Sequence, residues 1–414
     1  MTSANDMFKD QAAKIKVIGI GGAGGNAVNN MIEAELQGVK FIVANTDAQA
    51  LAISNAPVKL QIGQKLTEGL GAGANPQVGQ EAAQESEDAI RESLKDSHMV
   101  FITAGLGGGT GTGAATVIAR ICKDLDALTV AVVTKPFSFE GKKREKIAYE
   151  GVEELRQVAD TVITIPNDRL RGLAGKNARM LDMFKKADEI LLHSVKGITD
   201  LIMMPGLVNL DFADVSTTMS RAGLAIMGIG AAKGDNRAIQ AAQNAISHPL
   251  LEDVSISGAK GVLMNITCTS DLTMEEMTEA SDCIYNEVGE DAEIIWGQTF
   301  DESLGDEMRV TVIATGIGGT KEAKTSNKAI SPIKLIDDTF AEDGIREKLR
   351  PSANHEVNKT NTIDYDDPTY MRRREAIEEN VRPLHDSRRT DKYDGIAFDN
   401  NDLDVPTFLR KKAN

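Results

Sequence analysis

Apolar runs alternate with amphipathic stretches through the first 166 residues of the chain. Short apolar, β-branched runs are typical of buried strands, and the stretches between them have the three- to four-residue spacing of helices. The predicted strands are Ile15–Ile20, Lys40–Ala44, Met99–Thr103, Leu128–Thr134 and Thr161–Ile165. The predicted helices are Asn26–Leu36, Pro76–Leu94, Thr112–Lys123 and Gly141–Ala159. This order predicts an α/β fold with a mainly parallel, Rossmann-like sheet, covered by helices on both faces and binding ligands at the carboxyl edge of its strands.

A long helix and a second mixed α/β region follow this first region. The stretch Asn177–Met204 reads as one connecting helix, which Pro205 and Gly206 end. The later strands are expected near Ala222–Ala232, Lys260–Thr269, Ala292–Gly297 and Met308–Thr315, and the later helices at Asn236–Ser247 and Thr273–Val288.

The character of the chain changes after Gly319. Residues 320–402 are rich in Asp, Asn, Lys, Arg, Thr and Pro and poor in apolar clusters, which predicts a disordered linker. Apolar side chains return in Leu403–Arg410, next to basic residues. A short apolar and basic segment at the end of a disordered tether is expected to dock on a partner. A frayed terminus is the alternative.

Composition excludes several classes of function. A net charge of −16 makes the chain a poor partner for nucleic acid or an anionic bilayer, and 4% aromatic residues argue against a base-stacking surface. No run approaches the ~18 apolar residues that span a membrane, and Met1–Lys14 has no signal-peptide core. We therefore expect a cytoplasmic protein that does not insert into the membrane. Neither the cysteines nor the histidines have metal-ligand spacing.

A first glycine-rich loop follows the first predicted strand. Glycines at Gly19, Gly21 and Gly24 match the G-x-G-x-x-G pattern, in which backbone N–H groups and a helix N-terminus bind phosphate. Asp47 lies 23 residues after Gly24, near the acidic position of a dinucleotide site. An NAD-dependent Rossmann oxidoreductase therefore stays open as an alternative.

A second loop, Gly105–Gly113, carries six glycines and two threonines among nine residues. Such a loop wraps an anion with successive N–H groups, to which the hydroxyls of Thr110 and Thr112 add further donors. Two loops of this kind on neighbouring strands indicate a large phosphate load, such as a triphosphate. A third stretch, Gly69–Pro76, is a candidate contact for the γ-phosphate. The chain has no Walker-type lysine, so backbone amides and a metal ion are expected to offset the phosphate charge.

The second loop reads GGGTGTG over Gly107–Gly113 and resembles the signature of the tubulin/FtsZ family of GTPases. The resemblance continues through Pro136–Arg144, Ile165–Asp168 and Asn209–Val215. The segment Asp404–Arg410 resembles the C-terminal peptide of the FtsZ branch, which tubulins lack.

The resemblance implies a self-assembling division-ring GTPase that binds GTP or GDP with Mg²⁺, for which we name no protein ligand. It implies that Glu140 and Arg144 contact the ribose and neighbouring groups, and that Asn167 and Asp188 bond the guanine, with Phe184 against the base. The other residues implied to line the nucleotide are Gly22, Ala23, Gly24, Gly25, Asn26, Gly73, Gly107, Gly108, Gly109, Thr110, Gly111 and Thr112.

The expected parts are a flexible segment 1–13, a GTP-binding domain 14–176, and a connecting helix and loop 177–208. A GTPase-activating domain 209–318, the linker 319–402 and a partner-binding peptide 403–414 follow. The resemblance also implies that membrane-adaptor and regulatory division proteins bind Asp404–Arg410, and that the protein works at the midcell division site.

The resemblance assigns hydrolysis to Asn209, Asp211 and Asp214. Paired carboxylates three residues apart can orient a water, although an N-cap and a turn aspartate before a helix would show the same spacing. A helix from Asp188 to Met204 would carry the chain ~24 Å away from the base. We therefore expect Asp211 to serve the nucleotide of a neighbouring copy in a head-to-tail filament. A non-enzymatic scaffold is the further alternative.

Overall fold

The computed structural model describes residues 13–317, apart from 174–177, 205, 207, 209, 221–222, 252–255 and 290–291. The expectations for Asn209, for residues 1–12, for the linker 319–402 and for the peptide 403–414 lie outside these residues. Contacts divide the chain into a unit of residues 1–328, which contains all of the described residues, and a unit of residues 329–414.

One sheet runs through both halves of the described part of the chain, where ten strands pair in the order β3-β2-β1-β4-β5-β6-β7-β10-β8-β9. Neighbouring strands are parallel except where β10 pairs antiparallel with β7 and β8. The strands are β1 (Ile15–Ile20), β2 (Val39–Asn45), β3 (Val58–Gln61), β4 (Met99–Gly105), β5 (Leu128–Lys135), β6 (Thr161–Pro166), β7 (Gly223–Lys233), β8 (Gly261–Cys268), β9 (Glu293–Phe300) and β10 (Glu307–Thr315). The mainly parallel sheet expected from the sequence is confirmed.

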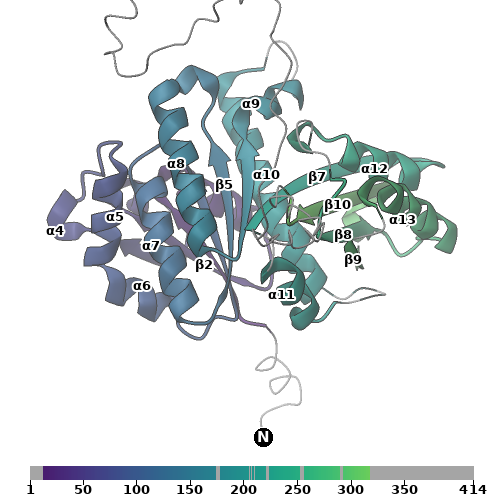
Figure 1. The fold of residues 1–414 in the computed structure, drawn as a ribbon, viewed down its shortest axis with the longest axis horizontal. Helices are drawn as coiled ribbons and strands as arrows, with labels where there is room; N and C mark the ends of the chain where they lie inside the picture. The colour runs from purple at the N-terminus through teal and green to yellow at the C-terminus, as the bar shows by residue number, and fades with distance from the viewer. Residues whose placement is uncertain are drawn as a thin grey trace, which may run out of the picture. The chain divides into compact units, whose positions relative to one another are not determined.

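Helices cover the sheet on both faces (Figure 1). The helices of the first half are α2 (Gly21–Glu33), α3 (Ala48–Ala52), α4 (Gln64–Thr67), α5 (Pro76–Glu85), α6 (Glu87–Leu94), α7 (Thr110–Asp124), α8 (Lys142–Val158), α9 (Asn167–Leu170) and α10 (Met180–Met203). Those of the second half are α11 (Phe212–Ser220), α12 (Arg237–Ile246) and α13 (Met274–Val288).

Side chains of successive strand residues point into different cores, as the period of two along a strand requires. In β1, Ile15 and Val17 join the core beneath α2 and α10, whereas Ile18 and Ile20 join the core beneath α5 to α8. A third core lies between α12, α13 and the strands of the second half.

The observed elements differ from the predicted ones chiefly at two helices and one edge strand. Helix α2 begins at Gly21 rather than Asn26, because the glycine loop itself forms the first turn of the helix. The predicted helix Pro76–Leu94 is interrupted at Ser86, whose Oγ accepts the N–H of Gly63 at 3.0 Å. Strand β3 was not predicted, because it is a short edge strand with no buried residue.

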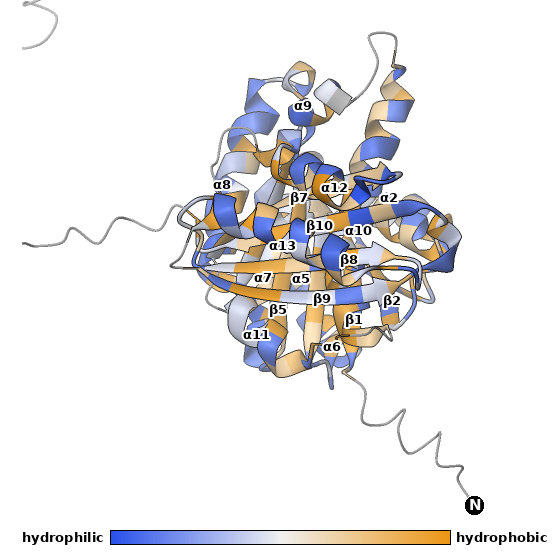
Figure 2. Cartoon of the chain, turned by 90° about the vertical axis from the view of Figure 1, so that its right-hand side faces the viewer, coloured by the Kyte–Doolittle hydropathy of each residue, from blue (hydrophilic) through white to orange (hydrophobic). Residues whose placement is uncertain are grey.

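Helix α10 connects the first half of the described part to the second half. Its buried face includes Ile190, Leu191, Val195 and Ile198, which pack in the same core as α2 and α11. Burial of each side chain contributes roughly 1.5–3 kcal/mol, so the helix is firmly fixed against the sheet. Helix α10 contacts α2 and β5 in the first half and β8 and β9 in the second half. In Figure 2, coloured by hydropathy, α10 lies between α2 and β8. No helix in the described ranges, α10 included, has the length and apolar character to cross a membrane.

Candidate nucleotide site

Two helix N-termini meet at the carboxyl ends of β1 and β4. Helix α2 begins at Gly21 directly after β1, and α7 begins at Thr110 shortly after β4. The first N–H groups of a helix have no partner inside the helix, and they lie at the positive end of its dipole. Such a pair of N-termini is a ready site for a large anion.

A cavity of about 460 Å³ opens at this junction. Its walls come from the ends of β1, β4 and β5, from the starts of α2, α7, α8 and α9, and from the short 3₁₀ helix Ser138–Glu140, with α10 closing one side. The lining residues are Ile20, Gly21, Gly22, Ala23, Asn26, Gly105, Leu106, Gly108, Gly109, Thr110, Gly111, Thr134, Pro136, Glu140, Arg144, Asn167, Phe184, Ala187 and Asp188.

Glycine is required where the two loops approach each other and the sheet. Gly21 has a positive φ of 71°, and a Cβ there would lie 3.1 Å from the backbone nitrogen of Gly111. At Gly24 a Cβ would lie only 2.4 Å from the carbonyl oxygen of Thr103. Any side chain at Gly24 would push α2 away from β4 and widen the gap between the helix N-termini.

Two threonines of the second loop have different surroundings. The Thr112 Oγ1 accepts the N–H of Gly107 at 3.0 Å, and Thr112 is buried, so its hydroxyl holds the loop from inside. Thr110 lines the cavity, and its Oγ1 lies 2.7 Å from the Oγ1 of Thr46.

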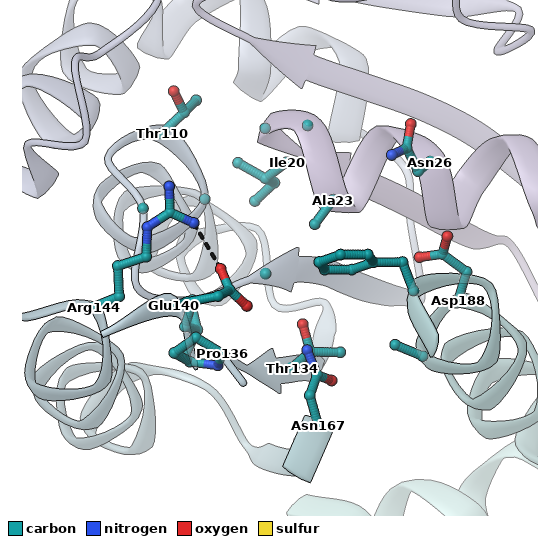
Figure 3. A pocket seen from close by; sticks show the side chains of 18 of the residues that line it. Ile20, Ala23, Asn26, Thr110, Thr134, Pro136, Glu140, Arg144, Asn167 and Asp188 are labelled. Carbon is teal, nitrogen blue, oxygen red and sulfur yellow. Dashed lines mark hydrogen bonds and ion pairs between the residues drawn. The ribbon is translucent and has the colours of Figure 1, made fainter. Parts of the chain in front are cut away.

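Glu140 and Arg144 form an ion pair on the cavity wall, with 2.7 Å between Oε2 and Nη1 (Figure 3). The other carboxylate oxygen of Glu140 accepts the N–H of Phe137 at 3.0 Å. Because Glu140 is thereby fixed and its partner is half exposed, the remaining guanidinium donors of Arg144 are free to turn towards a ligand.

The opposite end of the cavity presents hydrogen-bond acceptors. The Asn167 Oδ1 is buried and has no hydrogen-bond partner among the described residues. Burial raises the pKa of the Asp188 carboxyl from 3.8 to about 6. Both groups are costly to bury without a donor, so this end of the cavity suits a ligand rich in N–H groups. Figure 3 shows Asp188 beside Asn26 at this end, away from Thr110 and Arg144.

An aromatic group borders the same end of the cavity. Phe184 is 40% exposed and meets Phe137 edge to face, with 5.4 Å between the ring centroids. Phe137 in turn stacks on Phe139. The exposed part of the Phe184 ring is therefore held in place for a flat apolar partner.

The structure brings most of the predicted site residues to one cavity. Those on its wall are Gly22, Ala23, Asn26, Gly108, Gly109, Thr110, Gly111, Glu140, Arg144, Asn167, Phe184 and Asp188. Those that lie off its wall are Gly24, Gly25, Gly73, Gly107 and Thr112. Gly24 packs against β4, and Gly107 and Thr112 are joined by the hydrogen bond that holds the loop. Gly25 is buried beside Val43.

Sequence reasoning missed other wall residues, chiefly Thr134, Pro136 and Ala187. Thr134 and Pro136 lie at and just after the end of a strand that was predicted, and the carboxyl edge of the sheet was the expected binding edge. Ala187 lies three residues after Phe184 on one helix face. These three positions could therefore have been predicted from the sequence.

Asp211 and Asp214 do not line this cavity. The Asp211 Oδ1 accepts the backbone N–H of Asp214 at 2.9 Å, so Asp211 caps the N-terminus of α11. Along α10, the 15 residues from Asp188 to Met203 span about 23 Å. Figures 1 and 2 both place α9, at the cavity, and α11 at opposite ends of the described part.

Asp47 caps a short helix and does not serve a dinucleotide site. Its Oδ1 accepts the N–H groups of Gln49 and Ala50, at 2.8 and 3.2 Å, and so caps α3. The residue does not line the cavity. Asp47, the residue that the dinucleotide pattern would place on an NAD ribose, is thus absent from the described wall.

The sheet, the paired helix N-termini and the acceptor-rich end of the cavity define a nucleotide-binding α/β protein with room for a polyphosphate. Residues 14–175 match the sequence model of the Tubulin/FtsZ family, GTPase domain, and residues 223–318 match that of the FtsZ family, C-terminal domain.

Relatives match over nearly the whole chain. Cell division protein FtsZ of Coxiella burnetii is 47% identical over 97% of each chain, and that of Pseudomonas aeruginosa is 46% identical over 97% of this chain and 98% of the relative. The solved FtsZ dimer of M. jannaschii superposes with a TM-score of 0.71 at 47% identity, over 76% of this chain and 92% of that one. The chain belongs to the FtsZ family and is a GTPase. The alternatives of an NAD-dependent oxidoreductase and of a non-enzymatic scaffold are wrong.

Because folding raises the pKa of Asp188, the ionised carboxylate destabilises the folded protein at high pH, and the protonated carboxyl does not. In the nucleotide-free protein, the contribution of this carboxyl to stability is present in full below pH 3.8 and is lost as the pH rises through about 6. Asp188→Asn should therefore raise the melting temperature at pH 8, and the gain should shrink as the pH falls below about 6.

Asp182→Asn is the matched control on the same helix. Hydrogen bonds from Arg179 lower the pKa of Asp182, so its contribution is present above pH 3.8 and is lost on acidification. The control should not stabilise the protein at pH 8. Thermal unfolding of both variants at pH 5 and pH 8 makes the comparison, and no gain from Asp188→Asn at pH 8 would contradict the argument.

Proposed function

We propose that the chain binds GTP in the cavity at the ends of β1 and β4 and forms head-to-tail filaments in which each junction completes a hydrolytic site. In this proposal residues 14–176 bind the nucleotide and residues 209–318 activate its hydrolysis on the adjoining copy. The separation of Asp211 and Asp214 from the cavity carries the proposal, because it leaves the acidic pair unable to reach the nucleotide of its own subunit.

The acceptors at one end of the cavity fit guanine. Asp188 accepts the N1–H and the exocyclic amine, and the unpartnered Oδ1 of Asn167 takes a further donor. Adenine lacks the N1–H group and would leave the Asp188 carboxylate desolvated without a donor. Phe184 lies against the base, and Arg144, held by Glu140, contacts the sugar and adjacent groups.

The glycine loops at the other end of the cavity fit the phosphates. The first-turn N–H groups of α2 and α7 converge there, and a Cβ added at Gly22 or Gly108 would meet no atom within 4 Å. The backbone at these two positions is therefore open to a ligand. Positioning and charge stabilisation by such fixed donors supply most of the rate in phosphoryl transfer.

Mg²⁺ is proposed to accompany the triphosphate. No cluster of three or more candidate ligand side chains exists in the described ranges, and of the two wall carboxylates Glu140 is paired with Arg144 while Asp188 borders the base. The wall fits an ion that would be held by phosphate oxygens and water. The phosphate groups would in turn accept hydrogen bonds from the N–H groups of Gly108–Gly111. When bound, the ion would offset charge on the phosphate oxygens.

Removal of Mg²⁺ with a chelator should abolish turnover while guanine nucleotide stays bound, because the amide donors and Asp188 remain. Turnover and retained nucleotide are measured on the same sample, and turnover is restored by adding Mg²⁺ but not Na⁺. Unchanged turnover in the chelator would contradict the role of the ion.

In the proposed reaction Asp211 and Asp214 of one copy approach the γ-phosphate held by the next and orient the attacking water. Asp211 uses one carboxylate oxygen to cap α11, which fixes its position, and the second oxygen remains to accept a proton from water. Loss of the γ-phosphate then weakens the junction and allows turnover of the filament.

A mixing experiment tests whether the acidic pair acts on the neighbouring copy. Asp211→Ala should bind GTP but lose at least ~100-fold of its turnover. Gly108→Glu places a negative side chain in the open phosphate end of the cavity and should abolish binding. A mixture of the two should recover turnover, because the Gly108→Glu copy supplies Asp211 to the nucleotide of the other.

The matched control replaces Gly108→Glu by a chain that carries both substitutions. This double variant has no Asp211 to offer, so its mixture with Asp211→Ala should stay inactive. Steady-state phosphate release is the measurement. A first mixture no faster than Asp211→Ala alone would refute action across the junction.

We further propose that the protein acts in cell division in the cytoplasm, at the midcell site, and that Asp404–Arg410 binds membrane-adaptor and regulatory division proteins. Its apolar and basic side chains at the end of a long polar stretch support this, together with the division proteins found as relatives. Nucleic acid is not a proposed partner of this acidic chain.

Deletion of Asp404–Arg410 should leave filament sedimentation and GTP turnover unchanged and abolish recruitment to the division site. A chain with the same seven residues in scrambled order is the control for length and charge. Normal recruitment of the deleted chain would exclude the peptide as the docking segment.

A further inference from the structure

Thr46 lies behind the phosphate end of the cavity and is absent from its wall. It directly follows β2 and is fully buried. Its Oγ1 lies 2.7 Å from the Oγ1 of Thr110, the loop threonine that lines the cavity (Figure 3 shows Thr110 at the rim).

The backbone around Thr46 is fixed by a neighbouring segment. The carbonyl oxygen of Thr46 accepts a hydrogen bond from Thr67 Oγ1 at 3.3 Å, and the same hydroxyl contacts the carbonyl oxygen of Gly63 at 3.0 Å. Two residues further along, Ala48 donates its N–H to Gly69 at 3.1 Å. Thr46 is therefore held on the backbone side, and its hydroxyl is presented to Thr110 from a rigid position.

Each hydroxyl carries one hydrogen, and only one of the two hydrogens can lie between the oxygens, so only one hydroxyl donates to the other. Phosphate oxygens at neutral pH accept hydrogen bonds and do not donate them. If the Thr110 hydroxyl donates to a phosphate oxygen, its own oxygen is left to accept, and the proton between the two threonines must come from Thr46. Each donation polarises the next, which strengthens the bond to the anion.

We propose that Thr46 is a positioning residue for phosphate, which acts by donating its hydroxyl proton to Thr110 and so turning the Thr110 proton towards the ligand. This inference rests on the proposed function, because it requires Thr110 to contact a phosphate group. It assigns a role to a buried residue that neither lines the cavity nor belongs to a glycine loop.

The test is a double-mutant cycle on nucleotide affinity. Thr46→Val removes the hydroxyl at nearly constant volume, and Thr46→Ser keeps it. GTP affinity is measured with a fluorescent GTP analogue at protein concentrations too low for assembly, so that only isolated copies contribute. Loss of one such hydrogen bond predicts a roughly three- to tenfold weaker affinity for Thr46→Val and little change for Thr46→Ser.

The cycle is closed with Thr110→Val. Because Thr46 acts through the hydroxyl of Thr110, the double variant Thr46→Val/Thr110→Val should bind no more weakly than Thr110→Val alone. A merely structural role of Thr46 would instead give additive losses. Thermal unfolding of each nucleotide-free variant checks that the fold is kept, and Thr46→Ala replaces Thr46→Val if valine is poorly accommodated.

The outcomes separate the inference from the proposed function. If Thr110→Val binds GTP as the unmodified protein does, the phosphate role of Thr110 fails and the inference falls with it. If Thr110→Val weakens binding and Thr46→Val does not, or if the two losses add, the inference alone is overturned. Weakening by Thr46→Val, recovery in Thr46→Ser and no added loss in the double variant support it.

Discussion

The meeting of two helix N-termini at the edge of a parallel sheet is the constraint on which the site depends. Helices α2 and α7 can bring their free N–H groups to one cavity only if their first turns nearly touch each other and the strand ends. Glycine is what permits that approach, at Gly24 against β4 and at Gly21 against Gly111. The glycine-rich sequence thus serves the packing of the helices, and the convergence of their N-termini, which we propose to bind the phosphates, follows from that packing.

The long helix α10 links this site to the rest of the molecule. Its N-terminal half closes the cavity with Phe184 and Asp188, and its C-terminal end leads to the segment that carries Asp211. Because the helix is packed along its length, it places about 23 Å of helix axis between Asp188 and the segment that leads to Asp211. A rigid spacer of this kind fits our proposal that catalysis requires a second copy and that assembly and hydrolysis are coupled.

Much of the fold could be predicted from the sequence, because the strands predicted at Ile15–Ile20 and Met99–Thr103 are short runs of mainly apolar residues. The start of α2 could not, since glycines are poor helix formers and only tertiary contacts hold Gly21–Gly25 in a helix. The glycine pattern predicted an anion site, but it could not tell wall residues such as Gly108 from packing residues such as Gly24. Nor could the sequence reveal that the hydroxyl oxygen of Thr112 accepts the N–H of Gly107. Thr46 carries no sequence signal, because the role that we propose for it depends on a contact between segments 64 residues apart.

The central claim is that a single copy holds GTP but cannot complete its hydrolysis. The most direct measurement is GTP turnover per molecule as a function of protein concentration, with light scattering recorded on the same samples to report assembly. The account predicts that turnover per molecule is nearly absent in dilute, monomeric samples and rises together with scattering. The same turnover per molecule in monomeric and assembled samples would contradict it.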